Sequence, residues 1–337
     1  MTSGSADGRP PALRRILRRL LSIPTPLILG ICLVLAMIVL WWQGALTEFW
    51  DTVREASLGL ALAGLALFVV GLAVQCYRWN ALVKMANQGK SDLPRATEAF
   101  LASILINYAA PVGLAVPSRA ALTKRALGLD SNATGTIALW EIAADVLVLG
   151  FASLFWFLFA NGALPAVLDE LGDAALQFAI LGIVLFVLGA VAIGVLLKRP
   201  TLRTKVTTLL RAIALAPKQR PAAAFEVLII TITFWILQAV TLGVFIKAMN
   251  VDVSFQLLHG LTSVPFLVGI LSPIPGGAVV RESLMYVVAR LSEVPGGEVV
   301  AAAVLYRMAL FVSIPILFAG IRLWIKIQSG QSAHRVA

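Results

Sequence analysis

Charged residues are scarce in this chain, and so are cysteine and histidine. Asp, Glu, Lys and Arg make up 13% of the 337 residues, whereas apolar residues make up 60%. A soluble domain would have about 25% charged residues. Cys32 and Cys76 lie in apolar runs, which excludes a disulfide framework and a thiolate metal site. His259 and His334 are too few and too distant for a zinc centre, so we expect no metal and no cofactor.

The charge that is present is strongly positive, with a net value of +10 at pH 7. A basic chain of this kind could bind nucleic acid. However, Lys and Arg gather in the connections beside long apolar runs, where they set the orientation of membrane spans. We therefore expect a membrane as the partner and no nucleic acid.

Long apolar runs dominate the sequence. A helix needs about 20 mostly apolar residues to cross a hydrocarbon core of about 30 Å. Six runs meet this requirement, at approximately Leu27–Leu46, Leu58–Tyr77, Ala133–Ala160, Leu176–Leu197, Ala222–Ile246 and Val299–Ile325. Two further stretches, Ala96–Leu127 and Phe255–Ala289, are apolar but are interrupted by proline, glycine and charge. The sequence predicts an all-α polytopic membrane protein with about six full transmembrane helices.

Residues 1–25 precede the first apolar run. Leucine and isoleucine recur there at helical spacing, opposite arginines, which predicts a basic amphipathic helix on an anionic cytoplasmic leaflet. A simple topology determinant would explain the same residues. The first apolar run is too long for a signal peptide and ends in Trp41 and Trp42, so we expect it to be retained.

The positive-inside rule gives one orientation for the whole chain. The arginine-rich start and the connection 198–221, which has no acidic residue, are expected in the cytoplasm, as is the tail 326–337. The loop that carries Asp169, Glu170 and Asp173 has no basic residue and is expected outside. The prediction is a multi-pass protein of the inner membrane with both termini in the cytoplasm.

Residues 26–330 are interpreted as one transmembrane domain with two halves, about 58–197 and 222–325. Each half contains a span, an interrupted stretch and a second span. With the orientation above, the first interrupted stretch enters from the cytoplasm and the second from outside. This arrangement predicts two opposed re-entrant helical hairpins in an inverted repeat, the pattern of many transporters. Matching positions in the two stretches are Pro111, Gly113 and Arg119 in the first, and Pro275, Gly277 and Arg281 in the second.

The interrupted stretches and the nearby charges are the candidate binding site. Non-helical backbone at membrane depth must be buried in protein or line a wet cavity. A charge near the bilayer centre costs about 2.5–3.5 kcal/mol and therefore normally faces the interior with a partner. A helix that begins after a break favours an anion such as phosphate. The candidate substrate-binding residues are Asn107, Pro111, Gly113, Arg119, Glu141, Asp145, Pro273, Pro275, Gly276, Gly277, Arg281, Glu282 and Arg307.

The charged candidates carry specific expectations. Glu141 and Asp145 are four residues apart, so they share a helix face and need a cation or a proton between them. An arginine from a hairpin is the expected partner. Arg281 and Glu282 are adjacent, so we expect them to face different ways. The alternatives are a kinked helix pair without a ligand and an ion pair that only fixes helix packing.

Two other observations limit the function. Arg78 and Trp79, at the end of the second apolar run, are interpreted as an interface anchor. The chain shows no Ser/His/Asp set and no nucleotide-binding glycine loop, so we do not expect an enzyme.

These residues resemble the transmembrane, flippase-like domain of lysylphosphatidylglycerol synthases and of stand-alone bacterial and archaeal membrane proteins. The resemblance extends from about Leu58 to Trp324. It implies translocation of a phospholipid or a polyprenyl-linked lipid, whereas the synthase activity belongs to a separate soluble domain. The residues that carry it are Arg78-Trp79, Leu82, Asn107, Pro111, Gly113, Arg119, Glu141, Asp145, Pro273 to Gly277, Arg281-Glu282, Tyr306-Arg307, Pro315 and Gly320.

Three functions remain open at this point. In the first, the chain is a lipid transporter in which Arg119, Arg281 and Arg307 hold a phosphate headgroup, while Glu141 and Asp145 balance the arginines and take up protons. In the second, it is an integral-membrane enzyme that acts on a lipid-linked substrate. In the third, it is a non-transporting scaffold for a separately encoded lipid-modifying enzyme.

Overall fold

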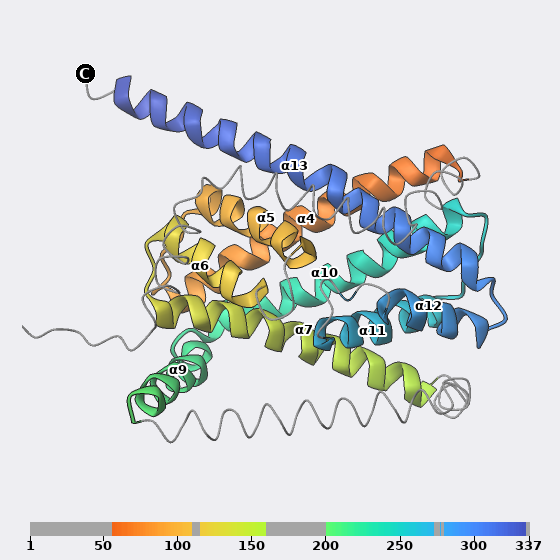
Figure 1. Cartoon of the computed structure of the whole chain (residues 1–337), viewed down its shortest axis with the longest axis horizontal. Helices are drawn as coiled ribbons and strands as arrows, with labels where there is room; N and C mark the ends of the chain where they lie inside the picture. The colour runs from red at the N-terminus through yellow and green to blue at the C-terminus, as the bar shows by residue number, and fades with distance from the viewer. Residues whose placement is uncertain (1–55, 110–114, 160–199, 273–276, 278–279, 335–337) are drawn as a thin grey trace, which may run out of the picture.

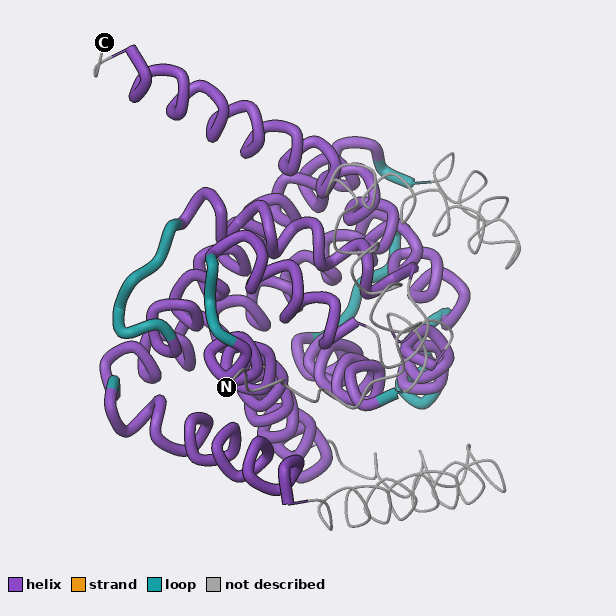
Figure 2. Tube along the Cα trace, turned by 60° about the vertical axis from the view of Figure 1, so that its left-hand side comes forward, coloured by secondary structure: helices purple, strands orange, loops and turns teal. Residues whose placement is uncertain are grey.

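The computed structural model describes residues 56–109, 115–159, 200–272, 277 and 280–334. Almost all of these residues are helical, and short connections join the helices (Figure 2). No strand occurs within the described ranges. The all-α prediction is therefore confirmed for this part of the chain.

Four long helices form the frame of the molecule (Figure 1). Each is long and apolar enough to cross a membrane, and α13 meets this condition over Gly296–Gln328. They confirm four of the six predicted spans. The other two, Leu27–Leu46 and Leu176–Leu197, lie outside the described residues, as does the amphipathic segment predicted at 1–25. The four helices are α4 (Leu58–Ala86), α7 (Ser131–Phe159), α10 (Pro221–Ala248) and α13 (Gly296–His334).

The two interrupted stretches each form a pair of shorter helices. The first pair is α5 (Leu93–Ala109) with α6 (Ala115–Leu127), and the second is α11 (Phe255–Leu271) with α12 (Val280–Arg290). The helices of each pair pack against one another. Along the long axis, α5 and α6 lie toward the end that carries α9, and α11 and α12 lie toward the opposite end (Figure 1).

The long helices run in two opposite directions. α4 and α13 run toward the end that carries α9, whereas α7 and α10 run away from it (Figure 1). The basic connection 198–221 contains a helix, α9 (Pro200–Gln219). Trp140 ties α9 to α7 because its indole Nε1–H donates to the carbonyl oxygen of Ile213 at 2.9 Å.

Local sequence explains where several helices begin. Asp130 precedes α7, and its Oδ1 accepts a hydrogen bond from the amide of Ala133 at 2.6 Å. Ser254 caps α11, where its hydroxyl accepts from the amide of Leu257 at 3.1 Å. Pro221 is the first residue of α10, a position at which a helix has no use for the missing amide hydrogen.

Small residues allow the helices to approach closely. A Cβ atom at Gly64 of α4 would lie 2.8 Å from the ring of Phe245 on α10, and one at Gly260 of α11 would lie 2.4 Å from Trp156 on α7. Close contact through small residues is typical of helices packed in a membrane. It brings α4 against α10 and α11 against α7.

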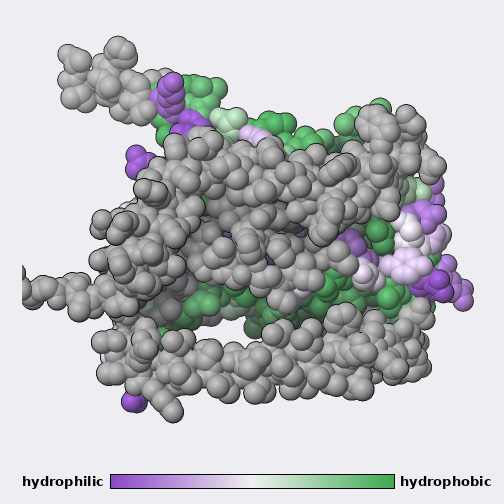
Figure 3. Space-filling model, in the orientation of Figure 1, coloured by the Kyte–Doolittle hydropathy of each residue, from purple (hydrophilic) through white to green (hydrophobic). Residues whose placement is uncertain are grey.

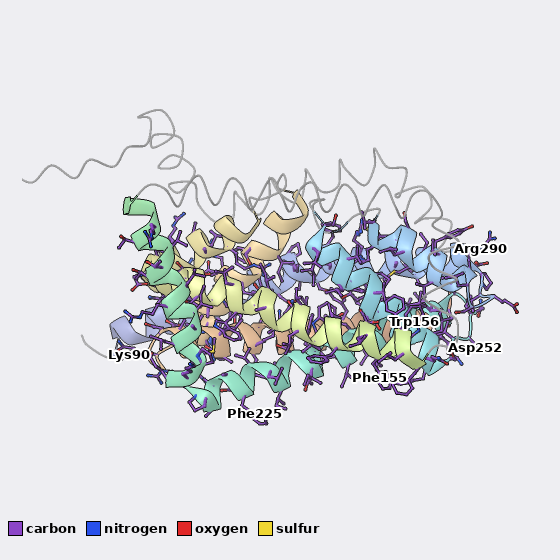
Figure 4. The ribbon with its side chains drawn as sticks, turned by 90° about the horizontal axis from the view of Figure 1, so that it is seen from below. Lys90, Phe155, Trp156, Phe225, Asp252 and Arg290 are labelled. Atoms are coloured by element: carbon purple, nitrogen blue, oxygen red, sulfur yellow. The ribbon has the colours of Figure 1, made fainter. Side chains whose placement is uncertain are left out.

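The outer surface is apolar along the length of the bundle. Phe151 is 67% exposed and Phe225 is 65% exposed. In Figure 3 the described surface is mostly green between the two ends, with purple residues at the end near the turn between α12 and α13. Figure 4 places Lys90 at one end and Asp252 and Arg290 at the other. This distribution fits a bundle surrounded by lipid.

Candidate functional site

Arg78 of α4 lies at the centre of the first charged cluster. Its guanidinium contacts the Oδ1 atom of Asp145 through Nη1, and its Nη2 donates to the Oδ2 atom at 3.2 Å. The same Nη2 lies 3.5 Å from Oε1 of Glu141. Arg78 and Trp79 are each 1% exposed, so the interface-anchor interpretation is wrong. The carboxylates of α7 face the end of α4, and they draw the arginine inward.

Arg119 of α6 completes the first cluster. It donates to the Oε2 atom of Glu141, so each oxygen of this glutamate contacts one arginine. The expected contact between Glu141 and a hairpin arginine is therefore present. The guanidinium carbon of Arg119 lies 5.7 Å from the ring of Trp79 and 5.6 Å from that of Phe100. Its side chain is 16% exposed, and its buried Nε atom has no hydrogen-bond partner among the described residues.

Glu282 of α12 is the centre of the second charged cluster. Its Oε1 atom accepts from Nε and Nη2 of Arg281 at 3.2 and 3.1 Å, and from Nη2 of Arg307 on α13 at 2.5 Å. The expectation that Arg281 and Glu282 face different ways is wrong. Their long side chains turn along the helix surface until the charged ends meet beside Arg307.

Aromatic and amide groups surround this second cluster. The guanidinium carbon of Arg281 lies 4.7 Å from the ring of Phe266 and 5.8 Å from the ring of Tyr306. The Tyr306 hydroxyl donates to the side-chain oxygen of Gln238 on α10. Aromatic faces attract a guanidinium that has left water, which supports the arginines in an apolar surrounding.

The two clusters share a design in which one glutamate contacts two arginines. We name them the α7 cluster (Arg78, Arg119, Glu141 and Asp145) and the α12 cluster (Arg281, Glu282 and Arg307). In each, a short helix and the following long helix are joined by an arginine–glutamate contact. The polarity is reversed, because α6 supplies the arginine in the α7 cluster and α12 supplies the glutamate in the other.

Trp235 of α10 lies between the two clusters. Its indole Nε1–H donates to Oδ1 of Asp145 at 2.8 Å, and its ring meets Phe266 edge-on with centroids 5.4 Å apart. Phe266 in turn lies beneath Arg281. The sequence analysis did not identify Arg78, Trp235 or Gln238 as site residues. Of these, Gln238 could have been found, because a polar residue inside an apolar span normally faces the protein interior.

The glycine of the second break is held in a specific conformation. Gly277 has φ +63° and is buried, and a Cβ atom there would lie 2.8 Å from the Cα atom of Gly269 on α11. A residue with a side chain would fit neither the backbone angle nor the space. Gly277 therefore lies directly against α11.

The remaining sequence candidates are placed as follows. Asn107 lies in the last turns of α5. Pro111, Gly113, Pro273, Pro275 and Gly276 lie outside the described residues. The structure therefore brings the charged candidates together in two groups, and adds Arg78 and Trp235 to them. Within the described part of the chain, no three His, Cys, Asp or Glu residues converge as metal ligands would.

Where two arginines share a buried glutamate, another oxyanion can replace the carboxylate as a ligand of an arginine. Guanidinium groups bind carboxylate and phosphate with the same forked geometry, and removing one partner of such a group without replacement costs several kcal/mol. A phosphate that enters would therefore have to replace a carboxylate contact as it forms its own. Both clusters offer this chemistry to a phosphate-bearing molecule.

Comparison with known proteins places the chain in a family. No curated protein matches it. The family model described as the lysylphosphatidylglycerol synthase TM region matches residues 27–319, which confirms the resemblance seen in the sequence. With this match over nearly the whole chain, and with four helices able to cross a membrane, the chain is a multi-pass membrane protein that belongs to the lysylphosphatidylglycerol synthase TM region family.

Proposed function

We propose that the protein is a lipid transporter that moves a phospholipid or a polyprenyl-phosphate-linked lipid across the inner membrane. The observation that carries this proposal is the pair of buried clusters in which one glutamate holds two arginines. Charges are expensive in a bundle surrounded by lipid, and those inside spans normally mark a substrate pathway. Arginine pairs are suited to a phosphate headgroup.

The helix arrangement supports a transport function. The elements α4, α5, α6 and α7 correspond in order to α10, α11, α12 and α13, and corresponding long helices run in opposite directions. The helix pairs also exchange partners, since α11 packs on α7 and α5 packs on α13. We interpret this as the inverted repeat expected from the sequence, with the short pairs as re-entrant hairpins. Transporters of this kind bind their substrate where the repeats meet.

We assign different roles to the arginines of the α7 cluster. Arg78 contacts two carboxylates and is fully buried, so it holds α4 to α7. Arg119 forms its ionic contact with Glu141, which Arg78 also contacts. The buried Nε atom of Arg119 has no hydrogen bond among the described residues. An incoming phosphate would take Arg119, and Glu141 would remain with Arg78. No charge would be left alone during this exchange, which keeps the barrier low.

In the α12 cluster the headgroup would meet Arg281 and Arg307. Both arginines contact the same oxygen of Glu282, so a phosphate with several oxygens could join them without breaking every contact. Glu141 and Asp145 balance the arginines of the α7 cluster when no lipid is bound, and we propose that they take up protons during the cycle. A lipid would pass from one cluster to the other with its acyl chains in the bilayer.

Basic residues give the proposed orientation. The last turn of α4 contains Lys84, that of α6 contains Lys124 and Arg125, and that of α9 contains Lys218. The C-terminal ends of α4, α6 and α9 lie toward the same end of the bundle (Figure 1). The positive-inside rule assigns this end to the cytoplasm, together with both termini.

Movement of labelled lipid in proteoliposomes tests the proposal. Headgroup accessibility is followed for a labelled phospholipid and a labelled polyprenyl phosphate, with wild type beside Arg119→Ala and Arg307→Ala. Each variant removes charged hydrogen bonds and should slow lipid movement by about 10–100-fold. Arg95→Ala is the matched control, because Arg95 is 61% exposed and pairs only with Asp92 in the described structure.

Other results of this experiment would contradict the proposal. Equal lipid movement by wild type, by both site variants and by the control would contradict a role for the clusters in transport. Absence of movement of both lipids in wild type would contradict the proposal as a whole. Stable co-purification of a lipid-modifying enzyme in that case would favour a scaffold.

A further inference from the structure

The two charged clusters are joined by a continuous series of side-chain contacts. It runs from Arg78 to Asp145, from Asp145 to the indole of Trp235, from Trp235 to Phe266, and from Phe266 to Arg281. We propose that Trp235 is a positioning residue that couples the α7 cluster to the α12 cluster during lipid transfer. This inference rests on the proposed transport function and adds a mechanical role for a residue that need not touch the lipid.

The hydrogen bond of Trp235 controls the orientation of Asp145. The indole Nε1–H donates to Oδ1 at 2.8 Å, and this same oxygen contacts Nη1 of Arg78. Asp145 thus receives two donors on one oxygen and a third, Nη2 of Arg78, on the other. If the indole moves away, the carboxylate loses one of three donors, and its contact with Arg78 must readjust. The position of Trp235 therefore affects the residue that holds α4 to α7.

The ring of Trp235 also contacts the second helix pair, through Phe266 of α11. Its ring meets that of Phe266 at 71°, with centroids 5.4 Å apart, and the guanidinium carbon of Arg281 lies 4.7 Å above Phe266. Rings in contact cannot pass through one another in a close-packed interior. A displacement of α11 toward α10 when a headgroup binds Arg281 would therefore press Phe266 against Trp235.

The contacts of Trp235 connect three helices. Asp145 belongs to α7, Trp235 to α10 and Phe266 to α11, and each of these helices packs against the other two. Motion at the α12 cluster would thus change the hydrogen bonding of Asp145, and by reciprocity a change at Asp145 would alter the α12 cluster. Such coupling would allow one cluster to release a headgroup as the other receives it.

Trp235→Phe tests this role with a small change. Phenylalanine keeps a ring against Phe266 but removes the N–H donor. The expected result in proteoliposomes is a maximal rate of labelled-phospholipid movement lowered about tenfold or more, with an unchanged half-saturating mole fraction of lipid. Trp140→Phe is the matched control, because it removes an indole donor from another interhelical hydrogen bond, the one to Ile213 on α9, a helix that supplies no residue to either cluster. It should move lipid at the wild-type rate.

A second variant tests the other link and guards against misfolding of the first. Phe266→Leu removes the ring contact with Trp235 and should give the same decrease in maximal rate. If both residues act in one series, the double variant should be no slower than the slower single variant. A decrease in maximal rate in the double variant equal to the product of the two single decreases would overturn the proposed coupling.

The outcomes separate the coupling from the function on which it rests. Normal movement by Trp235→Phe, equal to that of Trp140→Phe, would overturn the coupling while transport itself stands. A half-saturating mole fraction raised in proportion to the loss of rate would also overturn it, because Trp235 would then bind the lipid directly. Absence of lipid movement in wild type would overturn the proposed function and the coupling together.

Discussion

The α7 cluster and the α12 cluster differ in what they hold together. In the α7 cluster, arginines from α4 and α6 meet two carboxylates of α7, so ionic contacts fix three helices. In the α12 cluster, ionic contacts between described residues join α12 to α13, and α10 contributes the neutral contact between Gln238 and Tyr306. A charged contact that fixes several helices resists motion more than a neutral one. We therefore expect the first half to be the more rigid side of the candidate site and the second half the more movable side.

Arg78→Ala should have the largest effect on stability. It would leave Asp145 without its guanidinium in a buried position, and breaking one partner of such a pair costs about 3–5 kcal/mol. Thermal unfolding in detergent should show a large drop in the midpoint temperature of the variant. Arg307→Ala should cause a smaller drop, because Glu282 keeps its contacts with Arg281. Equal decreases in the two variants would remove the distinction between a rigid and a movable side.

Gly277→Ala should destabilise the second half by about 1–3 kcal/mol, since it combines a left-handed backbone with a clash against Gly269. The measurement is the same thermal unfolding in detergent. Gly320→Ala is the control, because no atom lies within 4 Å of a Cβ there and the residue is helical. That variant should be neutral or up to about 1 kcal/mol more stable. A neutral Gly277→Ala would contradict the close approach of Gly277 to α11.

Tyr306→Phe should cost about 1 kcal/mol, because it removes the hydroxyl that donates to Gln238 and leaves an amide oxygen to find another donor. The ring contacts with Phe68 and Phe266 would remain. Thermal unfolding beside Arg78→Ala would rank the neutral and ionic contacts. A loss as large as that of Arg78→Ala would show that the second half is fixed as firmly as the first.

Asp252→Asn should have the smallest effect, below about 0.5 kcal/mol. The pair that Asp252 forms with Lys247 is exposed to solvent, and salt screens such pairs. The midpoint of unfolding at low and at high salt should be the same as for wild type within error. A larger change would mean that surface charge, as well as the buried clusters, stabilises this end of the bundle.

The sequence predicted the long helices and the two breaks because the bilayer imposes simple requirements. A helix must be long enough to cross hydrocarbon, and Pro and Gly interrupt it visibly. The match of Arg119 to Glu141 was also accessible, since two carboxylates on one face need a cation. These predictions depend on local spacing and on the cost of charge in lipid, both of which can be evaluated along the chain.

The remainder of the candidate site depends on which helix faces which, and local spacing does not contain that information. Arg78 follows an apolar run and precedes Trp79, as an interface anchor would, and only the facing carboxylates of α7 reveal its burial. Trp235 lies among apolar residues and acquires a role only because Asp145 and Phe266 come from two other helices. Arg281 and Glu282 meet because their side chains bend, which adjacency alone does not predict.

A comparison of lipids with and without phosphate tests the central claim most directly. Wild-type protein is placed in vesicles that contain a labelled phospholipid, a labelled polyprenyl phosphate or a labelled neutral glycolipid, and the accessibility of each headgroup is followed over time. We predict that at least one phosphate-bearing lipid moves and that the neutral glycolipid does not, since phosphate is the ligand that we propose for the arginines of the two clusters. Equal movement of all three lipids, or movement of the neutral glycolipid alone, would contradict this account.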